Sequence, residues 1–327
     1  MGSWSRYLFL SILLFIPEGG CTHKSSDSPH STSSTEQTKK TGQPLFEMIE
    51  QGSPPLKTLR YKLSAMKTQS VEMLMDMSVG AQAGGSDVQP PQDLPPISIV
   101  ISITPRHITQ DGNLPYDFKV VSTKVTGDQD DESDMAQGMK AELGRLRGLS
   151  GSAEVSARGV TNKVDIHLPA KDSDRNELLN RMKEEIIGMS IPLPQQPVGK
   201  GARWKVTRSV NSGSINMLQI ATYTLSRLDD TSMKIDVDFE QNASPQPLDS
   251  SNLAGASARL VSLHSDGGGS SVIDFSSLVP LANAFSHTNV VMEIRAHGNQ
   301  QRVTTTLDLK MTMRPVDKHQ KNTGNSP

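Results

Sequence analysis

The sequence has 327 residues, of which 35% are hydrophobic, 21% are charged and only 4% are aromatic. A chain of this length can bury a substantial core, which Leu, Ile, Val and Met must mainly supply. The formal net charge of −2 and the even spread of basic residues exclude the electrostatic attraction on which nucleic-acid binding depends.

The first 21 residues have the pattern of an export signal. Arg6 is the charged residue of the leading segment, residues 7–16 form an apolar stretch, and Gly19 and Gly20 stand directly before Cys21. The apolar stretch is too short to cross a bilayer, which takes about 20 residues. It matches the hydrophobic region of a secretory signal peptide, which we assign to residues 1–20.

Cys21 is the only cysteine of the sequence, so no intramolecular disulfide can form. The segment resembles a bacterial lipoprotein signal, in which the cysteine after a pair of small residues is acylated, for example with palmitate, and becomes the new amino terminus. Glu18 departs from this pattern, because an apolar residue is typical there. The resemblance implies lipid attachment at Cys21, and the non-acidic Thr22 favours the outer membrane if the cell has one. The alternatives are an uncleaved signal anchor and a secreted protein with a free thiol.

Residues 21–43 are rich in Ser and Thr and show no apolar periodicity. Such a stretch cannot bury enough surface to offset its chain entropy. We therefore expect a flexible tether, which spans roughly 25 Å by random-coil scaling and lets the body stand off a membrane.

Beyond Pro44, apolar and polar residues alternate, as expected for strands with one buried face. The clearest cases are residues 71–79, 97–103 and 307–313, and the first and last place Met73, Met75, Met77, Met311 and Met313 on single faces. Weaker runs lie at 116–125, 152–168, 203–210, 214–228, 233–239, 257–264 and 289–296.

Two segments show the periodicity of amphipathic helices instead. In the first, near residues 135–147, the apolar positions are Met135, Met139, Leu143 and Leu146. In the second, they are Leu178, Met182, Ile186 and Met189. An acidic stretch precedes the first helix, and Asp174 with Glu177 resembles a capping box for the second.

The two halves of the chain also resemble each other. Residues 60–63 (RYKL) match 203–206 (RWKV), and 70–74 (SVEML) match 214–218 (SINML) at a nearly equal offset. We therefore expect an α+β, mainly antiparallel β fold, in which two duplicated β units form curved sheets with the two amphipathic helices packed against them. The first unit is expected at 44–170 and the second at 203–315. Residues 171–202 supply a helix and a Pro-rich connector, and 316–327 a disordered tail.

The connector leads from Pro192 and Pro194 through a Val-Gly-x-Gly step to Trp204. It resembles a segment of uncharacterised bacterial lipoproteins, a family that implies no catalytic residues. At the level of the fold, a curved antiparallel sheet with helices on one face is similar to the half-barrel of periplasmic lipoprotein carriers. That analogy concerns architecture and does not establish function.

Three motifs have the residue types of known sites but the wrong spacing. The acidic run 128–134 fails as an EF-hand, because Ser133 stands where Gly is required and Met139 where Glu binds calcium. Residues 264–266 (His-Ser-Asp) are adjacent, whereas triad members converge from separate places. We interpret them as a strand end that runs into a glycine turn at residues 267–269, which lack the Lys of a phosphate loop.

The eight histidines are scattered without zinc spacing, so neither a metal nor another cofactor is expected. Methionine is the remaining signal, because the adaptable side chains of Met73, Met75, Met77, Met311 and Met313 suit variable apolar ligands. They also suit a core that is poor in aromatics. We therefore expect a non-enzymatic, membrane-anchored envelope lipoprotein that binds a hydrophobic ligand or an envelope partner. The alternatives are a structural or assembly protein with a solid core, and an envelope hydrolase whose residues converge from distant strands.

Lipid attachment at Cys21 can be tested by metabolic labelling with a fatty acid. We expect the Cys21→Ser variant to lose the label, because the thiol is the acylation site. Equal labelling of the variant and the unchanged protein would contradict the lipoprotein assignment.

Overall fold

The computed structural model describes residues 44–84, 90–127, 134–168, 179, 182–183, 186–188, 190–212, 214–248, 256–296 and 298–316. The export signal with Cys21, the expected tether, most of the acidic run and the expected tail lie outside these ranges.

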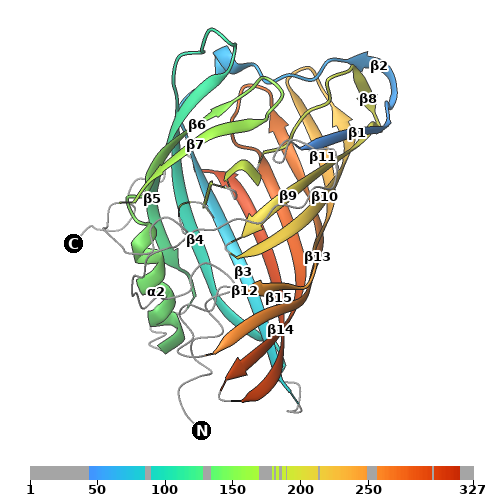
Figure 1. The fold of residues 1–327 in the computed structure, drawn as a ribbon. Helices are drawn as coiled ribbons and strands as arrows, with labels where there is room; N and C mark the ends of the chain where they lie inside the picture. The colour runs from blue at the N-terminus through green and yellow to red at the C-terminus, as the bar shows by residue number, and fades with distance from the viewer. Residues whose placement is uncertain are drawn as a thin grey trace, which may run out of the picture.

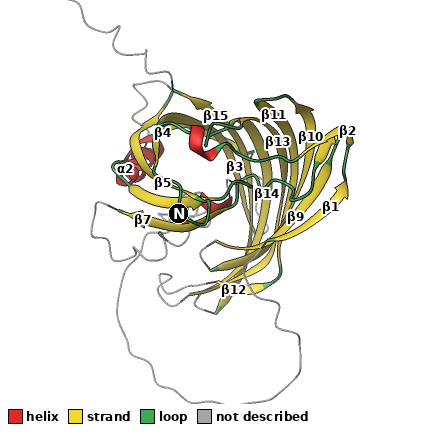
Figure 2. Ribbon diagram, turned by 90° about the horizontal axis from the view of Figure 1, so that it is seen from above, coloured by secondary structure: helices red, strands yellow, loops and turns green. Residues whose placement is uncertain are grey.

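The described residues form one 13-stranded antiparallel sheet (Figure 1). In sheet order the strands are β1 (Leu45–Glu50), β9 (Arg203–Ser212), β10 (Ile215–Leu228), β11 (Ser232–Ala243), β13 (Ser257–Asp274), β14 (Leu281–Ala296), β15 (Asn299–Pro315), β3 (Gln69–Ala83), β4 (Gln92–Pro105), β5 (Leu114–Val125), β6 (Ser150–Val155) and β7 (Thr161–His167), while β12 (Gln246–Leu248) pairs with β13. A small second sheet pairs β2 (Ser53–Lys57) with β8 (Val198–Lys200). Seen from above, the large sheet curls into a C with β1 and β7 toward its two ends (Figure 2).

The expected α+β fold of two separate β units is wrong. The runs of alternation lie in strands, although the run 152–168 is divided between β6 and β7, and β1, β2, β8 and β12 were not predicted. The pairing of β15 with β3, from Val303 opposite Ala83 to Pro315 opposite Val71, joins both halves into one sheet. Of the two internal sequence matches, one joins residues of two strands, since 70–74 lie in β3 and 215–218 in β10. The other does not, because 203–206 lie in β9 whereas 60–62 lie outside any strand. The fold class is mainly antiparallel β.

The expectation of two amphipathic helices packed against the sheet also needs correction. Helix α2 (Asp134–Leu146) lies where the first was predicted, and the Thr123 hydroxyl donates to the Leu143 carbonyl (3.0 Å) to hold it beside β5. In the second predicted helix only residues 179, 182–183 and 186–188 are described, all with helical backbone. Besides α2 and the short turn η1 (Leu63–Ala65), the described residues contain no other complete helix.

The register places one row of side chains across nine strands on the same face. Directly opposed residues of antiparallel strands share a face, and this row reads Trp204, Tyr223, Val237, Gly269, Ala284, Met311, Met75, Ile97 and Val125. Buried side chains gather at both of its ends. The Trp204 cluster contains Trp204, Tyr223, Leu225, Met233 and Ile235, and the Ile97 cluster contains Ile97, Ile99, Val120, Met139 and Leu143. Since α2 and the connector cover this face, it is the core side of the curl.

The Pro-rich connector closes the Trp204 end of the core. The indole of Trp204, which is fully buried, stacks on Tyr223 with ring centroids 5.6 Å apart and donates to the Pro192 carbonyl (3.0 Å). Arg158 donates to the Leu193 carbonyl (2.9 Å), and Arg60 donates to the Pro194 carbonyl (2.9 Å). Three side chains therefore donate to three successive carbonyls of a segment that cannot form a helix or a sheet ladder, because its prolines lack the backbone N–H that either would require.

We expect Trp204→Ala to lower the free energy of unfolding by about 3–5 kcal/mol, because it leaves a large cavity and an unpaired carbonyl. Urea unfolding followed by circular dichroism measures the loss. The control is Phe285→Ala, whose side chain is 57% exposed and whose removal should change stability by less than about 0.5 kcal/mol. Equal losses in both variants would show that the contact between Trp204 and the connector does not stabilise the core.

Candidate ligand-binding face

The five methionines singled out from the sequence form one block. Met75 on β3 lies directly opposite Met311 on β15, and Met73 lies opposite Met313. Met77 on β3 continues the same face, opposite a leucine of β15. We call these five residues the methionine block. The sequence predicted the two rows separately, and only the β15–β3 pairing brings them together.

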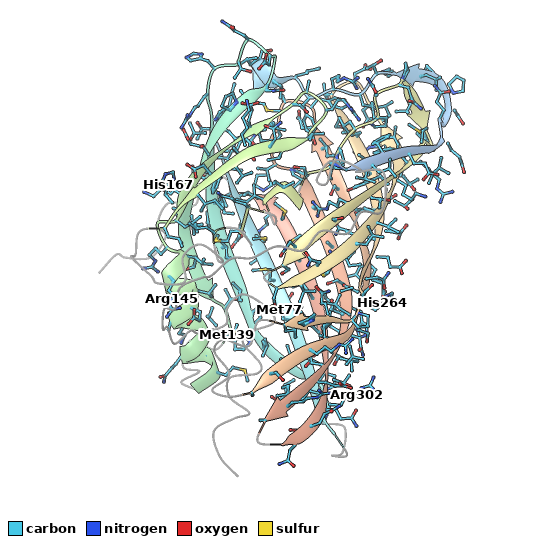
Figure 3. The ribbon with its side chains drawn as sticks, viewed as in Figure 1. Met77, Met139, Arg145, His167, His264 and Arg302 are labelled. Carbon is cyan, nitrogen blue, oxygen red and sulfur yellow. The ribbon has the colours of Figure 1, made fainter. Side chains whose placement is uncertain are left out.

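One side of the methionine block runs into the Ile97 cluster. Ile97 and Ile99 of β4 lie opposite Met75 and Met73. Met77 is only 5% exposed and packs in the cluster with Met139 of α2 (Figure 3). On this side, methionine fills a core, as the alternative interpretation of the sequence expected.

The other side of the methionine block meets small residues. Ala282 and Ala284 of β14 lie opposite Met313 and Met311, and Gly269 of β13 lies opposite Ala284. The set Gly267, Gly269, Ala282, Ala284 and Ser286 is called the small-residue wall. It separates the methionine block from the Trp204 cluster. No sequence signal identifies it, because its meaning depends on which strands become neighbours.

The expected glycine turn at residues 267–269 is wrong, since these residues lie inside the 18-residue strand β13. A Cβ atom on Gly267 would lie too close to the Phe285 carbonyl oxygen, and 2.6 Å from Cζ of Phe239. Glycine is therefore required so that the Phe239 ring can lie across the sheet. This close approach, rather than a turn, accounts for a glycine in the interior of a strand.

The face between the two clusters is only partly covered. Met73, Met75, Met311, Met313 and the small-residue wall are half-buried, whereas Trp204 and Ile235 on one side and Ile97 on the other are buried. Burial within the Trp204 cluster raises the pKa of Tyr223 above its ordinary value. The open stretch thus offers flexible thioethers beside small side chains, a chemistry suited to holding an apolar molecule.

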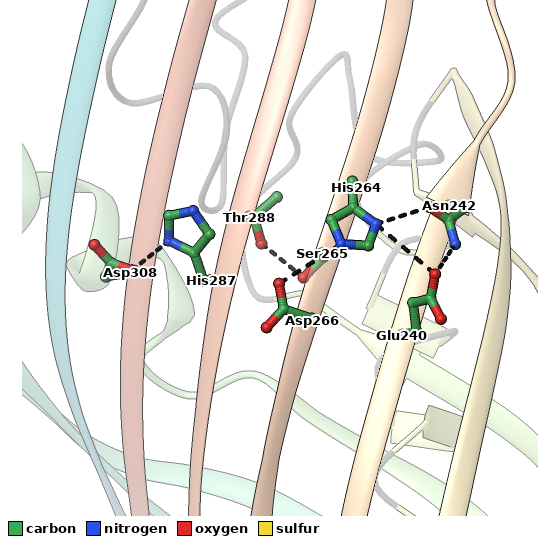
Figure 4. A network of polar contacts seen from close by, with 8 residues as sticks. All are labelled: Glu240, Asn242, His264, Ser265, Asp266, His287, Thr288 and Asp308. Carbon is green, nitrogen blue, oxygen red and sulfur yellow. Dashed lines mark hydrogen bonds and ion pairs between the residues drawn. The ribbon is translucent and has the colours of Figure 1, made fainter.

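Residues 264–266 point to opposite faces of the sheet (Figure 4). Ser265 is 3% exposed and shares a hydrogen bond of 2.8 Å with Thr288 on the core side. His264 and Asp266 are exposed on the outer side, where His264 Nδ1 lies 2.8 Å from Asn242 Oδ1. The three side chains therefore cannot form a catalytic triad.

The outer face of the sheet is polar. Between β14 and β15, His287 Nδ1 lies 2.7 Å from Asp308 Oδ1. A hollow of about 530 Å³ also opens on β4–β7, with Ser102, Lys119 and His167 in its lining. Phe118 and Val121 also line this hollow, so its wall mixes polar, charged and apolar side chains. Within the described ranges, no three His, Cys, Asp or Glu side chains are placed to hold a metal ion.

No helix in the described part of the chain is long and apolar enough to cross a membrane. The protein-family models and the curated proteins give no match to the sequence. Among solved structures, the chain is similar to the crystal structure of Pseudomonas aeruginosa OpdL, at 7% identity and a TM-score of 0.21, over 76% of this chain and 99% of that chain. A likeness this weak supports no inference about function.

The partial exposure of the methionine block predicts its reactivity. Thioether oxidation requires access to solvent, so brief treatment with peroxide should convert Met311 and Met313 to sulfoxides severalfold faster than the buried Met139 and Met233. Peptide mass spectrometry measures each rate. Equal rates at Met311 and Met233 would show that the face is closed.

Proposed function

We propose that this chain is an exported lipoprotein, anchored through an acyl group on Cys21, whose core-side face binds a hydrophobic molecule. The main observation that supports this proposal is the half-buried methionine block beside the small-residue wall. The proposal places the protein in the cell envelope, at the outer membrane if the cell has one. It involves no catalysis.

Burial of the exposed apolar surface of this face under a bound hydrophobic molecule would be favourable in free energy. Apolar surface removed from water contributes roughly 25 cal/mol per Å², and the thioethers of Met75 and Met311 remain partly in contact with water. A molecule laid across the small-residue wall would bury these side chains without displacing the two clusters. Methionine would adapt to occupants of different shape, because it is unbranched.

The lipid anchor would complement such a face. The tether expected at residues 21–43 would keep the body near a membrane that supplies or receives the hydrophobic molecule. An envelope protein that presents an apolar segment is the second kind of partner compatible with the same surface.

A structural or assembly role with a solid core remains the alternative, and the observation that favours it is the burial of Met77 among the residues of the Ile97 cluster. This alternative expects no uptake of any apolar probe.

Binding can be tested on the full chain carrying Cys21→Ser, which removes the attached lipid. We expect the protein to take up a fluorescent hydrophobic dye, and Met75→Gln or Met311→Gln to weaken uptake by about tenfold each, because each change removes about 1.5 kcal/mol of apolar contact. Fluorescence titration measures the dissociation constants.

The matched control is Leu74→Gln, which lies on the same strand but faces the other side of the sheet. It should leave uptake unchanged. Native mass spectrometry after gentle extraction adds a second readout. A clean apo mass together with no dye uptake would reject ligand binding and support the solid-core alternative.

A further inference from the structure

A row of polar side chains crosses the core side of the sheet beyond the small-residue wall. Gln219 on β10 lies opposite Gln241 on β11, Gln241 lies opposite Ser265 on β13, and Ser265 lies opposite Thr288 on β14. We call these four residues the polar row. They come from four neighbouring strands. Figure 4 shows two of them, Ser265 and Thr288, and the contact between their hydroxyls.

The polar row lies at a fixed distance from the methionine block. Thr288 faces Leu307 on β15, and Leu307 precedes Met311 by four residues on the same strand. At about 3.4 Å per residue, the row lies about 14 Å from Met311 and about 20 Å from Met313. A single extended molecule along β15 would therefore touch both.

The polar row is uncharged and has hydrogen-bonding capacity to spare. The Ser265–Thr288 bond uses one of two hydroxyl protons, and Gln241 brings an amide with two donors and an acceptor. The neighbouring cation, Arg208, donates to the Gln219 side chain. Its guanidinium also packs against Gly188, where an added Cβ would lie 2.6 Å from Nη2.

A second observation points to a missing polar partner at this place. Thr305 on β15 follows the same face, two residues from Leu307, and is 2% exposed. Its hydroxyl has no hydrogen-bond partner among the residues that the structure describes. Buried hydroxyls are normally paired, because an unpaired one keeps its full desolvation cost. Thr305 lies diagonally across from Thr288, so one group could reach both hydroxyls.

Building on the proposed ligand-binding function, we propose that the ligand is an acylated polyol: an amphiphile with an uncharged, hydroxyl-bearing head group. Its acyl chain lies over the methionine block, and its head group bonds to Gln241, Ser265, Thr288 and Thr305. Hydroxyls match this set because they both donate and accept.

A charged head group fits the same place poorly. A carboxylate or phosphate held against Ser265 and Thr288 would lose its water without gaining a counter-charge beside it, since Arg208 lies opposite Gln219 on β9, three strands away from Ser265. The polar row therefore discriminates between head groups, while the methionine block accepts the chain that they share.

The test compares three probes on the full chain carrying Cys21→Ser. They are a monoacylglycerol with a pyrene-labelled chain, the free fatty acid with the same chain, and a pyrene-labelled hydrocarbon of equal length. We expect the monoacylglycerol to bind at least about tenfold tighter than the other two. The triple variant Gln241→Met, Ser265→Ala, Thr288→Val should abolish this preference and leave binding of the hydrocarbon unchanged.

Removing both partners of the Ser265–Thr288 bond together leaves no orphaned hydroxyl, which protects the fold. If the triple variant still fails to fold, Gln241→Met alone should reduce the preference. Thr306→Val, on the outer side of β15, is the matched control and should behave as the unchanged protein.

The outcomes separate the two proposals. If no probe binds the unchanged protein, the proposed function itself is wrong. If the hydrocarbon or the fatty acid binds as tightly as the monoacylglycerol, or if the polar-row variants keep the preference, the face binds ligands but the polar row does not select them.

Discussion

The pairing of β15 with β3 makes one sheet out of two meandering halves. Leu307 to Met313 lie directly opposite Val79 to Met73, so the joint is lined on its core side by long apolar side chains. On its outer side, Arg314 of β15 lies 2.7 Å from Glu72 of β3, which also accepts a hydrogen bond from Ser98 of β4. These contacts hold the pKa of Glu72 below its usual value. The strands β15, β3 and β4 are thus held together by polar and charged contacts on the outer side of the sheet and by apolar contacts on its core side.

The pairing of β15 with β3 also explains why the core consists of two separate buried clusters. Each half brings its own buried cluster, one around Trp204 and one around Ile97, and the joint sets them on the same side of one curled sheet. Between them, Gly269 and Ala284 are too small to reach across the curl. The interior is therefore tightly packed at both ends and thinly lined in the middle.

The sequence pattern predicted correctly which side of a strand is buried, but it did not predict which strands pair with each other. Alternation over residues 97–103 and 307–313 identified strands and their buried sides, and helical spacing located α2. Alternation reports which side a residue faces but not which strand lies beside it, so the β15–β3 pairing, the single sheet and the small-residue wall could not be predicted. The glycines at 267–269 misled for a related reason, because Phe239, which requires Gly267, comes from a neighbouring strand.

The position of the polar side chains is the reason to prefer the proposed binding face over the solid-core alternative. The outer face already carries charged and imidazole groups, such as His287 with Asp308. On the core side, Gln241 and Thr288 are half-buried and Ser265 is buried, and this burial costs desolvation. A solid-core protein would be more stable with apolar residues there. Neutral hydrogen-bonding groups kept at a fixed spacing from flexible thioethers are what recognition of an amphiphile requires.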